Sequence, residues 1–100
     1  MSGTVEVLTL DELAGRCRTA PALVIEWVEL GWLRPADPGP DPAAWRFTGE
    51  ALLRLRTVSR LARELDLPAH AAVLVAELIE ERRRLERHAA ALERLFSAQD

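Results

Sequence analysis

The C-terminal third of the chain carries one continuous helical pattern, which restricts the fold more than any other segment. Asp66-Leu67-Pro68 breaks the pattern before it, and a helix is predicted from about Pro68 to Ala98. About thirty helical residues reach about 45 Å, because each residue adds about 1.5 Å. The preceding two thirds of the chain cannot cover a rod of that length. The distal half of this helix therefore needs a partner.

The spacing of apolar residues changes along this helix. Its first two turns are almost entirely apolar and should be buried. Beyond Leu78 the apolar residues thin to heptad spacing, which is typical of a coiled coil. One heptad position holds Leu78, Leu85 and Leu92, and the other holds Leu74, His88 and Leu95. We expect these six residues to form the seam of a homodimer, in which Glu81 and Arg82 are imperfections.

Two short helices joined by a tight turn are predicted near the N-terminus. Thr9 begins the sequence T-L-D-E, a capping box in which Thr9 and Glu12 exchange hydrogen bonds at a helix start. That helix should end near Arg18 and bury Leu10, Leu13, Ala14 and Cys17. Pro21 supplies a preset first-turn dihedral for the second helix, and Gly31 ends it as a left-handed C-cap.

The middle of the chain predicts a wing followed by a third helix. Residues 34–46 hold four of the six prolines, so they form a non-helical loop that Trp45 and Phe47 close. Residues 4–8 alternate like a short strand or an extended lead-in. Thr48 should cap a helix from about Gly49 to Leu65, whose apolar stripe is Leu52, Leu55, Val58, Leu61 and Leu65. Its other faces carry Arg54, Arg56, Arg60 and Arg63.

These elements predict an all-α fold: a winged helix-turn-helix head over residues 1–67, and a long helix for dimerisation over residues 68–98. One hundred residues leave little room for a large enclosed active site. The net charge of −3 argues against a general affinity for nucleic acid. The only cysteine, Cys17, rules out an intramolecular disulfide and is interpreted as a small core residue.

Catalytic, metal-binding and membrane functions have little support in the sequence. There is no Ser/His/Asp set, no phosphate-binding glycine loop and no Cys-His pair. His70 and His88 stand eighteen residues apart without a second ligand nearby. No signal pattern is visible, and no apolar run approaches the roughly 20 residues needed to span a bilayer. We expect a cytoplasmic, non-enzymatic protein without metal or cofactor.

The predicted second helix has an unusual charge for a helix-turn-helix protein. From Pro21 to Leu33 the sequence reads P-A-L-V-I-E-W-V-E-L-G-W-L, with no basic residue. Glu26 and Glu29 stand where a DNA-reading helix needs Arg, Lys, Asn or Gln. Because affinity for duplex DNA comes largely from neutralising phosphates, two carboxylates at this place oppose docking.

The order of elements resembles that of the MerR-type regulators. The motifs that carry the resemblance are L-T-L-D-E-L-A from Leu8, Pro21, E-L-G-W-L-R-P from Glu29, W-R-F from Trp45 and L-x-R-L-R from Leu52. MerR-type regulators usually grip phosphates with an Arg and two aromatic residues in the second helix. This chain has Ile25, Glu26 and Trp27 there, so it retains one aromatic and loses the cation. Arg18 replaces the glycine of the turn, and the wing is rich in proline.

These departures are similar to those of the chaperone modulatory protein CbpM family, MerR-like proteins that bind the J-domain of the DnaJ-like co-chaperone CbpA and keep it from its heat-shock chaperone. The resemblance implies a partner-binding role for Glu26 and Glu29 as contacts to a basic J-domain helix, and for Trp27 and Trp32 as exposed anchors. Burial of both Trp residues in the core or at a helix end is the alternative. The alternative function is a MerR-like regulator that binds DNA through the wing and the third helix.

Overall fold

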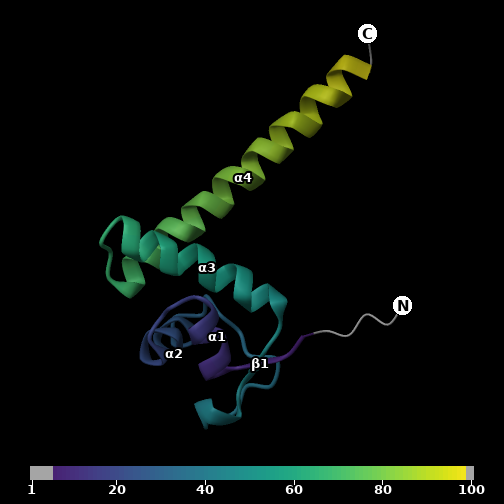
Figure 1. The fold of residues 1–100 in the computed structure, drawn as a ribbon. Helices are drawn as coiled ribbons and strands as arrows, with labels where there is room; N and C mark the ends of the chain where they lie inside the picture. The colour runs from purple at the N-terminus through teal and green to yellow at the C-terminus, as the bar shows by residue number, and fades with distance from the viewer. Residues whose placement is uncertain (1–5, 99–100) are drawn as a thin grey trace.

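The computed structural model describes residues 6–98 and consists of four helices and two very short strands (Figure 1). The elements are β1 (Leu8–Thr9), α1 (Leu10–Arg16), α2 (Pro21–Glu29), the 3-10 turn η1 (Pro42–Ala44), β2 (Arg46–Phe47), α3 (Gly49–Glu64) and α4 (Ala69–Ala98). This confirms the predicted all-α class, with a winged helix-turn-helix head and a long C-terminal helix.

The start of α1 is fixed by the predicted capping box. The Thr9 hydroxyl accepts from the Glu12 backbone N–H at 3.2 Å, and the Thr9 N–H donates to the Glu12 carboxylate at 2.9 Å. The helix ends at Arg16, slightly before the predicted end. The strand expected over residues 4–8 is observed only from Leu8, where β1 begins. Residues 4 and 5 lie outside the described residues.

The two strands close the wing onto the start of α1. Strand β1 pairs antiparallel with β2, with Leu8 opposite Phe47. Residues 34–45 form the expected loop, in which Pro42–Ala44 make the η1 turn after Asp41, whereas Arg46, predicted as part of the loop, belongs to β2. The Trp45 indole donates to the Gly39 carbonyl at 2.7 Å and stands edge-on to Phe47, with ring centroids 6.3 Å apart. The wing is therefore folded back on itself by its closing aromatics.

Both ends of α2 follow the sequence signals. Pro21 is in its first turn, and Gly31 follows its C-cap with a φ of 84°. Arg18, in the turn between α1 and α2, has a φ of 52°, the left-handed conformation that its glycine counterpart in MerR-type regulators adopts easily. Asp66, before α4, has a φ of 51°, which the sequence did not indicate.

Helix α3 buries most of its predicted stripe. Leu55 and Val58 are fully buried, and Leu52 and Leu61 are half-buried. Leu65 was wrongly included, because α3 ends at Glu64 and leaves Leu65 exposed as its C-cap. Thr48 is the N-cap as predicted, but its side chain makes no capping hydrogen bond. The largest fully buried side chains of the core are Trp27, Phe47, Leu13, Leu33, Leu55, Val24 and Val58.

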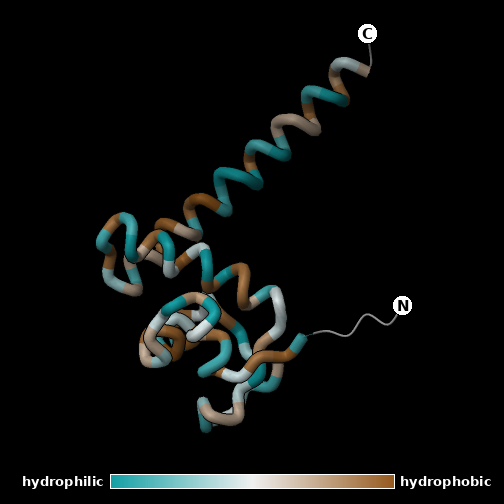
Figure 2. The backbone as a smooth tube through the Cα atoms, viewed as in Figure 1, coloured by the Kyte–Doolittle hydropathy of each residue, from teal (hydrophilic) through white to brown (hydrophobic). Residues whose placement is uncertain are grey.

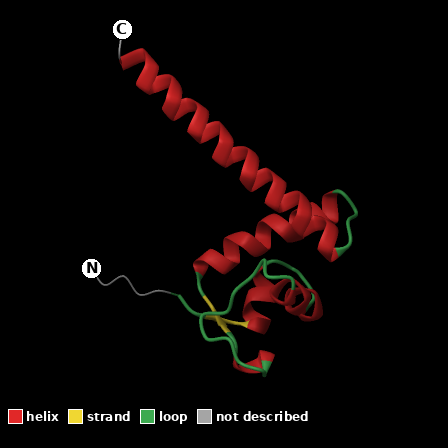
Figure 3. Ribbon diagram, turned by 180° about the vertical axis from the view of Figure 1, so that it is seen from behind, coloured by secondary structure: helices red, strands yellow, loops and turns green. Residues whose placement is uncertain are grey.

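Helix α4 packs only its first turns on the head and then extends away from it (Figures 1 and 3). Its buried residues are Ala69, Ala72, Val73 and Ala76, which meet α3 and α2. The expectation that the first two turns are buried is wrong at Leu74, which is 60% exposed. Beyond these first turns, apolar and polar segments alternate along the exposed part of α4 (Figure 2). Within residues 6–98, no helix combines the length and apolar character needed to cross a membrane.

Candidate functional site

Helix α2 presents an acidic outer face. Ala22, Glu26 and Glu29 are exposed and lie at helical spacings of four and three residues, which places them on one side of the helix. No basic residue occurs in α2. Neither carboxylate forms an ion pair within residues 6–98. Two uncompensated negative charges therefore face solvent on the helix that a DNA-binding protein of this architecture would place on its duplex.

The structure corrects the assignment of Trp27 as an exposed anchor. Its side chain is 0% exposed, and its indole N–H donates to the backbone carbonyl of Ala69 at 3.0 Å. Trp27 follows Glu26 by one residue and therefore points to a different side of the helix. It joins α2 to the first turn of α4, so its role is in the core.

Trp32 is also wrongly assigned as an exposed anchor, because it is only 3% exposed. The guanidinium of Arg54 lies over its ring at 3.7 Å from the centroid. The Trp32 indole donates to the Arg54 carbonyl at 2.9 Å, and Arg54 Nε donates back to the Trp32 carbonyl at 2.8 Å. Arg54 also pairs with Glu80 at 2.9 Å. Arg54 thus links the turn after α2 to α3 and α4.

Aliphatic residues supply the apolar surface beside Glu26 and Glu29. Leu30 is 44% exposed at the end of α2, and Leu23, Ile25 and Val28 are half-buried. Leu30 belongs to the apolar pattern of the second helix, which alone gives no sign that its side chain is exposed. Its place directly before Gly31 was the available signal, since the helix ends there and Leu30 is its C-cap.

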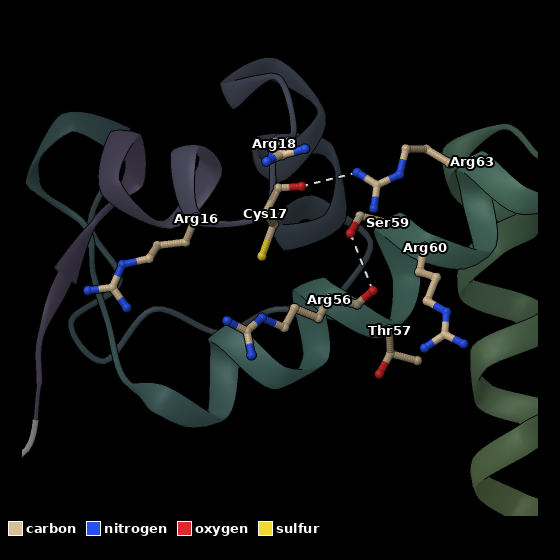
Figure 4. Close-up of a pocket in the computed structure, with 8 residues that line it drawn as sticks. All are labelled: Arg16, Cys17, Arg18, Arg56, Thr57, Ser59, Arg60 and Arg63. Atoms are coloured by element: carbon tan, nitrogen blue, oxygen red, sulfur yellow. Dashed lines mark hydrogen bonds between the residues drawn. The ribbon is translucent and has the colours of Figure 1, made fainter.

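A second charged feature lies between the end of α1 and α3 (Figure 4). We call it the arginine pocket: a cavity of about 340 Å³ lined by Arg16, Arg18, Arg56, Arg60 and Arg63. Cys17, Thr57 and Ser59 complete its wall, so no carboxylate lines it. The sequence indicated the arginines of α3 as one group, but it did not place Arg16 of α1 and Arg18 of the α1–α2 turn beside them, because only the fold brings these segments together.

Cys17 is a core residue of this pocket wall, as predicted. It is buried, and burial raises the pKa of its thiol while the nearby Arg56 and Arg63 guanidiniums oppose the rise. The Cys17 carbonyl accepts a hydrogen bond from Arg63 at 3.1 Å. Arg63 therefore satisfies a backbone carbonyl at the end of α1 and ties α1 to α3.

The predicted dimer seam lies along one side of the exposed part of α4. Its leucines are each more than half exposed, and its histidine is also exposed: Leu74, Leu78, Leu85, His88, Leu92 and Leu95. The last buried residue of α4 is Ala76, and Glu80 pairs with Arg54 of α3, so the seam residues from Leu85 onward lie beyond these contacts with the head. Among residues 6–98, no three His, Cys, Asp or Glu side chains are grouped closely enough to hold a metal ion.

Comparison with known proteins identifies the architecture. The family described as "MerR HTH family regulatory protein" matches residues 8–94, which span both the head and most of α4. No curated protein matches this chain.

Proposed function

This chain belongs to the MerR HTH family of regulatory proteins, and we propose that its ligand within that family is a protein. The proposed function is that of a non-catalytic modulator which binds the J-domain of a DnaJ-like co-chaperone of the CbpA type. Binding keeps the J-domain from its heat-shock chaperone partner. The observation that carries the proposal is the exposed pair Glu26 and Glu29 on a helix that has no cation.

Charge disfavours DNA as the ligand of α2. A protein gains affinity for DNA by replacing condensed counterions with its own Lys and Arg side chains. The outer face of α2 offers only carboxylates and small or apolar residues, so it has no group to replace a counterion. A duplex docked there would also bring its phosphates toward Glu26 and Glu29.

The same surface suits a basic helix. J-domains present such a helix to their chaperone, and complementary charges speed encounter and select the partner. Because Trp27 and Trp32 are buried, the apolar part of the contact is assigned to Leu30 with the half-buried Ile25 and Val28. These small aliphatic contacts support a modulator that can be released, since interface hot spots are enriched in large aromatic and Arg side chains.

We further propose that the protein acts as a homodimer through α4. The exposed leucine seam repeats every seven residues, and a second copy would supply the same repeat for knobs-into-holes packing. A dimer presents two acidic α2 faces, so each dimer can hold two J-domains. We expect this protein and its co-chaperone partner to act in the cytoplasm, where such co-chaperones work.

The test is titration of a fluorescently labelled CbpA-type J-domain with the full chain. Wild type is expected to bind saturably, and the double variant Glu26→Arg, Glu29→Arg is expected to bind at least about tenfold more weakly, a change of about 1.4 kcal/mol. The matched control is Glu86→Arg, Glu93→Arg. It changes the net charge equally at exposed positions of α4 outside the leucine seam.

Two results would reject the proposal. If wild type does not bind the J-domain, the partner assignment is wrong. If the α2 double variant binds as tightly as wild type and the α4 control, the assigned surface is wrong.

The arginines on the exposed face of α3 favour DNA binding as the second candidate function. Arg56, Arg60 and Arg63 are exposed there. This candidate predicts retarded migration of a DNA duplex, with an affinity that falls steeply as salt rises. Binding of the J-domain without such retardation favours the protein ligand; retardation that Glu26→Arg, Glu29→Arg leaves unchanged favours α3.

A further inference from the structure

The arginine pocket concentrates positive charge in a chain whose net charge is negative. Five guanidiniums line a cavity of about 340 Å³ into which no carboxylate of the wall projects, while the whole chain carries a net charge of −3. Like charges that are gathered around one pocket repel one another. An anion inside the pocket relieves that repulsion.

Ion pairs or backbone hydrogen bonds hold the side chains of three of the five arginines, and a fourth, Arg56, hydrogen-bonds the Cys17 side chain. Arg16 pairs with Glu6, Arg60 pairs with Glu64 at 3.1 Å, and Arg63 donates to the Cys17 carbonyl. Arg18 and Arg56 form no ion pair within residues 6–98. They come from opposite walls of the pocket, the α1–α2 turn and α3 (Figure 4). Their charges are therefore not neutralised by a carboxylate of the described residues, and an anion can pair with them from two sides.

The backbone at Arg18 adds to this argument. Its φ of 52° lies in the left-handed region, where side chains with a Cβ are disfavoured and glycine is not. A large cationic side chain is thus held at a position where the fold alone would be served better by glycine. We infer that the Arg18 guanidinium has a role in the pocket, and that this role compensates for the backbone strain.

The chemistry and size of the pocket indicate the class of ligand. A guanidinium forms paired, charge-assisted hydrogen bonds to phosphate oxygens, and several together match an anion with more than one phosphate. The volume is at the lower end of the range of about 300–1,000 Å³ for small-molecule sites. A long polyanion would also meet the negative charge of the rest of the chain, whereas a short one lies within a Debye length of about 10 Å from the arginines.

We propose that the arginine pocket binds the pyrophosphate group of a small ligand, either free or as part of a nucleoside diphosphate. Arg18 and Arg56 hold the phosphate oxygens from opposite walls, and Arg63 adds charge from a position fixed by Cys17. This site is independent of the J-domain proposal, since none of its residues belongs to the acidic face of α2.

Calorimetric titration of the full chain with sodium pyrophosphate tests the proposal. At constant ionic strength, wild type is expected to bind saturably, and Arg18→Gly and Arg56→Gln are each expected to bind at least about tenfold more weakly. Arg18→Gly is a clean variant because glycine accepts the backbone angle there. The matched control is Arg83→Gln, Arg87→Gln, which removes two exposed cations of α4 that form no ion pair within the described residues and should bind like wild type.

A second readout uses the pocket wall itself. Bound pyrophosphate should slow alkylation of the Cys17 thiol in wild type and leave its rate unchanged in Arg56→Gln. A nucleoside diphosphate that binds more tightly than pyrophosphate identifies a nucleotide as the source of the group, and equal affinity identifies the pyrophosphate group alone. The proposal is overturned if pyrophosphate gives no saturable heat, if the α4 control loses as much affinity as the pocket variants, or if only duplex DNA binds.

Discussion

Helix α2 and the distal part of α4 both carry large apolar side chains but differ in what covers them. In α2 the largest one, Trp27, is enclosed by the core and donates to the first turn of α4. In α4 the leucines from Leu74 onward are exposed, and Ala76 is its last buried residue. In α2 the exposed side chains include the two carboxylates, whereas in distal α4 they include the leucines.

This difference teaches that the two helices use apolar residues for different contacts. The apolar residues of α2 hold the head together, and its ligand surface is left to charge and to the small contribution of Leu30. The apolar residues of distal α4 contribute nothing to the head and are available to a second copy. Substitutions in the two helices should therefore affect different measurements.

The largest effect is expected from Trp27→Ala. Removing a fully buried Trp from a core costs about 3–5 kcal/mol, which is a large part of the stability of a small domain. The exposed counterpart, Leu85→Ala, should change the stability of the isolated chain by less than about 0.5 kcal/mol. Urea unfolding followed by circular dichroism measures both free energies.

A gentler variant keeps this test informative if Trp27→Ala does not fold. Trp27→Phe retains an aromatic ring but removes the hydrogen bond to the Ala69 carbonyl, which is worth about 1 kcal/mol. A Trp27→Phe chain as stable as wild type would contradict the link that we assign between α2 and α4.

The second prediction concerns association. The triple variant Leu78→Gln, Leu85→Gln, Leu92→Gln should keep its helix content, since Gln is nearly as good a helix former as Leu. It should lose the dimer, so that its melting temperature no longer rises with protein concentration as that of wild type does. Sedimentation equilibrium measures the mass directly. A wild-type chain that stays monomeric at all concentrations would remove the proposed role of the seam.

The third prediction concerns the effect of backbone strain at Arg18 on stability, compared with the effect of core burial at Trp27. Arg18→Gly should stabilise the chain by about 1 kcal/mol, because glycine adopts the left-handed conformation at this turn without a clash from Cβ. The gain arises without any change in the core. Urea unfolding of the variant beside Trp27→Ala checks it, and a loss of stability would show that the guanidinium contributes more to the fold than its backbone costs.

Local sequence signals predicted the helices well, but the burial of individual side chains depends on packing between distant segments. Thr9, Pro21 and Gly31 act through their own backbone neighbours, so their roles were readable in order along the chain. The burial of Trp27 and Trp32 depends on α4 and on Arg54, which are far away in sequence. No periodicity within α2 reports those contacts.

The candidate sites show the same division. The acidic face was predictable because Glu26 and Glu29 share one side of a single helix. Only the α3 wall of the arginine pocket was predictable, because its other wall comes from a distant segment that the fold brings beside α3. The leucine seam was predictable as a pattern, since the heptad repeat lies within α4.

The smallest effect is expected at the exposed capping box that starts α1. Hydrogen bonds from the Thr9 backbone and from its hydroxyl lower the pKa of the exposed Glu12 carboxyl below its ordinary value. A group with a lowered folded-state pKa stabilises the fold above its unfolded-state pKa, and this stabilisation is lost as pH falls through the folded-state value. Glu12→Gln should therefore lower stability slightly near neutral pH and reduce the loss of stability between about pH 5 and about pH 3. Urea midpoints of wild type and variant across this range measure the difference. Parallel profiles would show that the capping box acts through geometry alone, and would place α1 with α2 as a helix held by its buried residues.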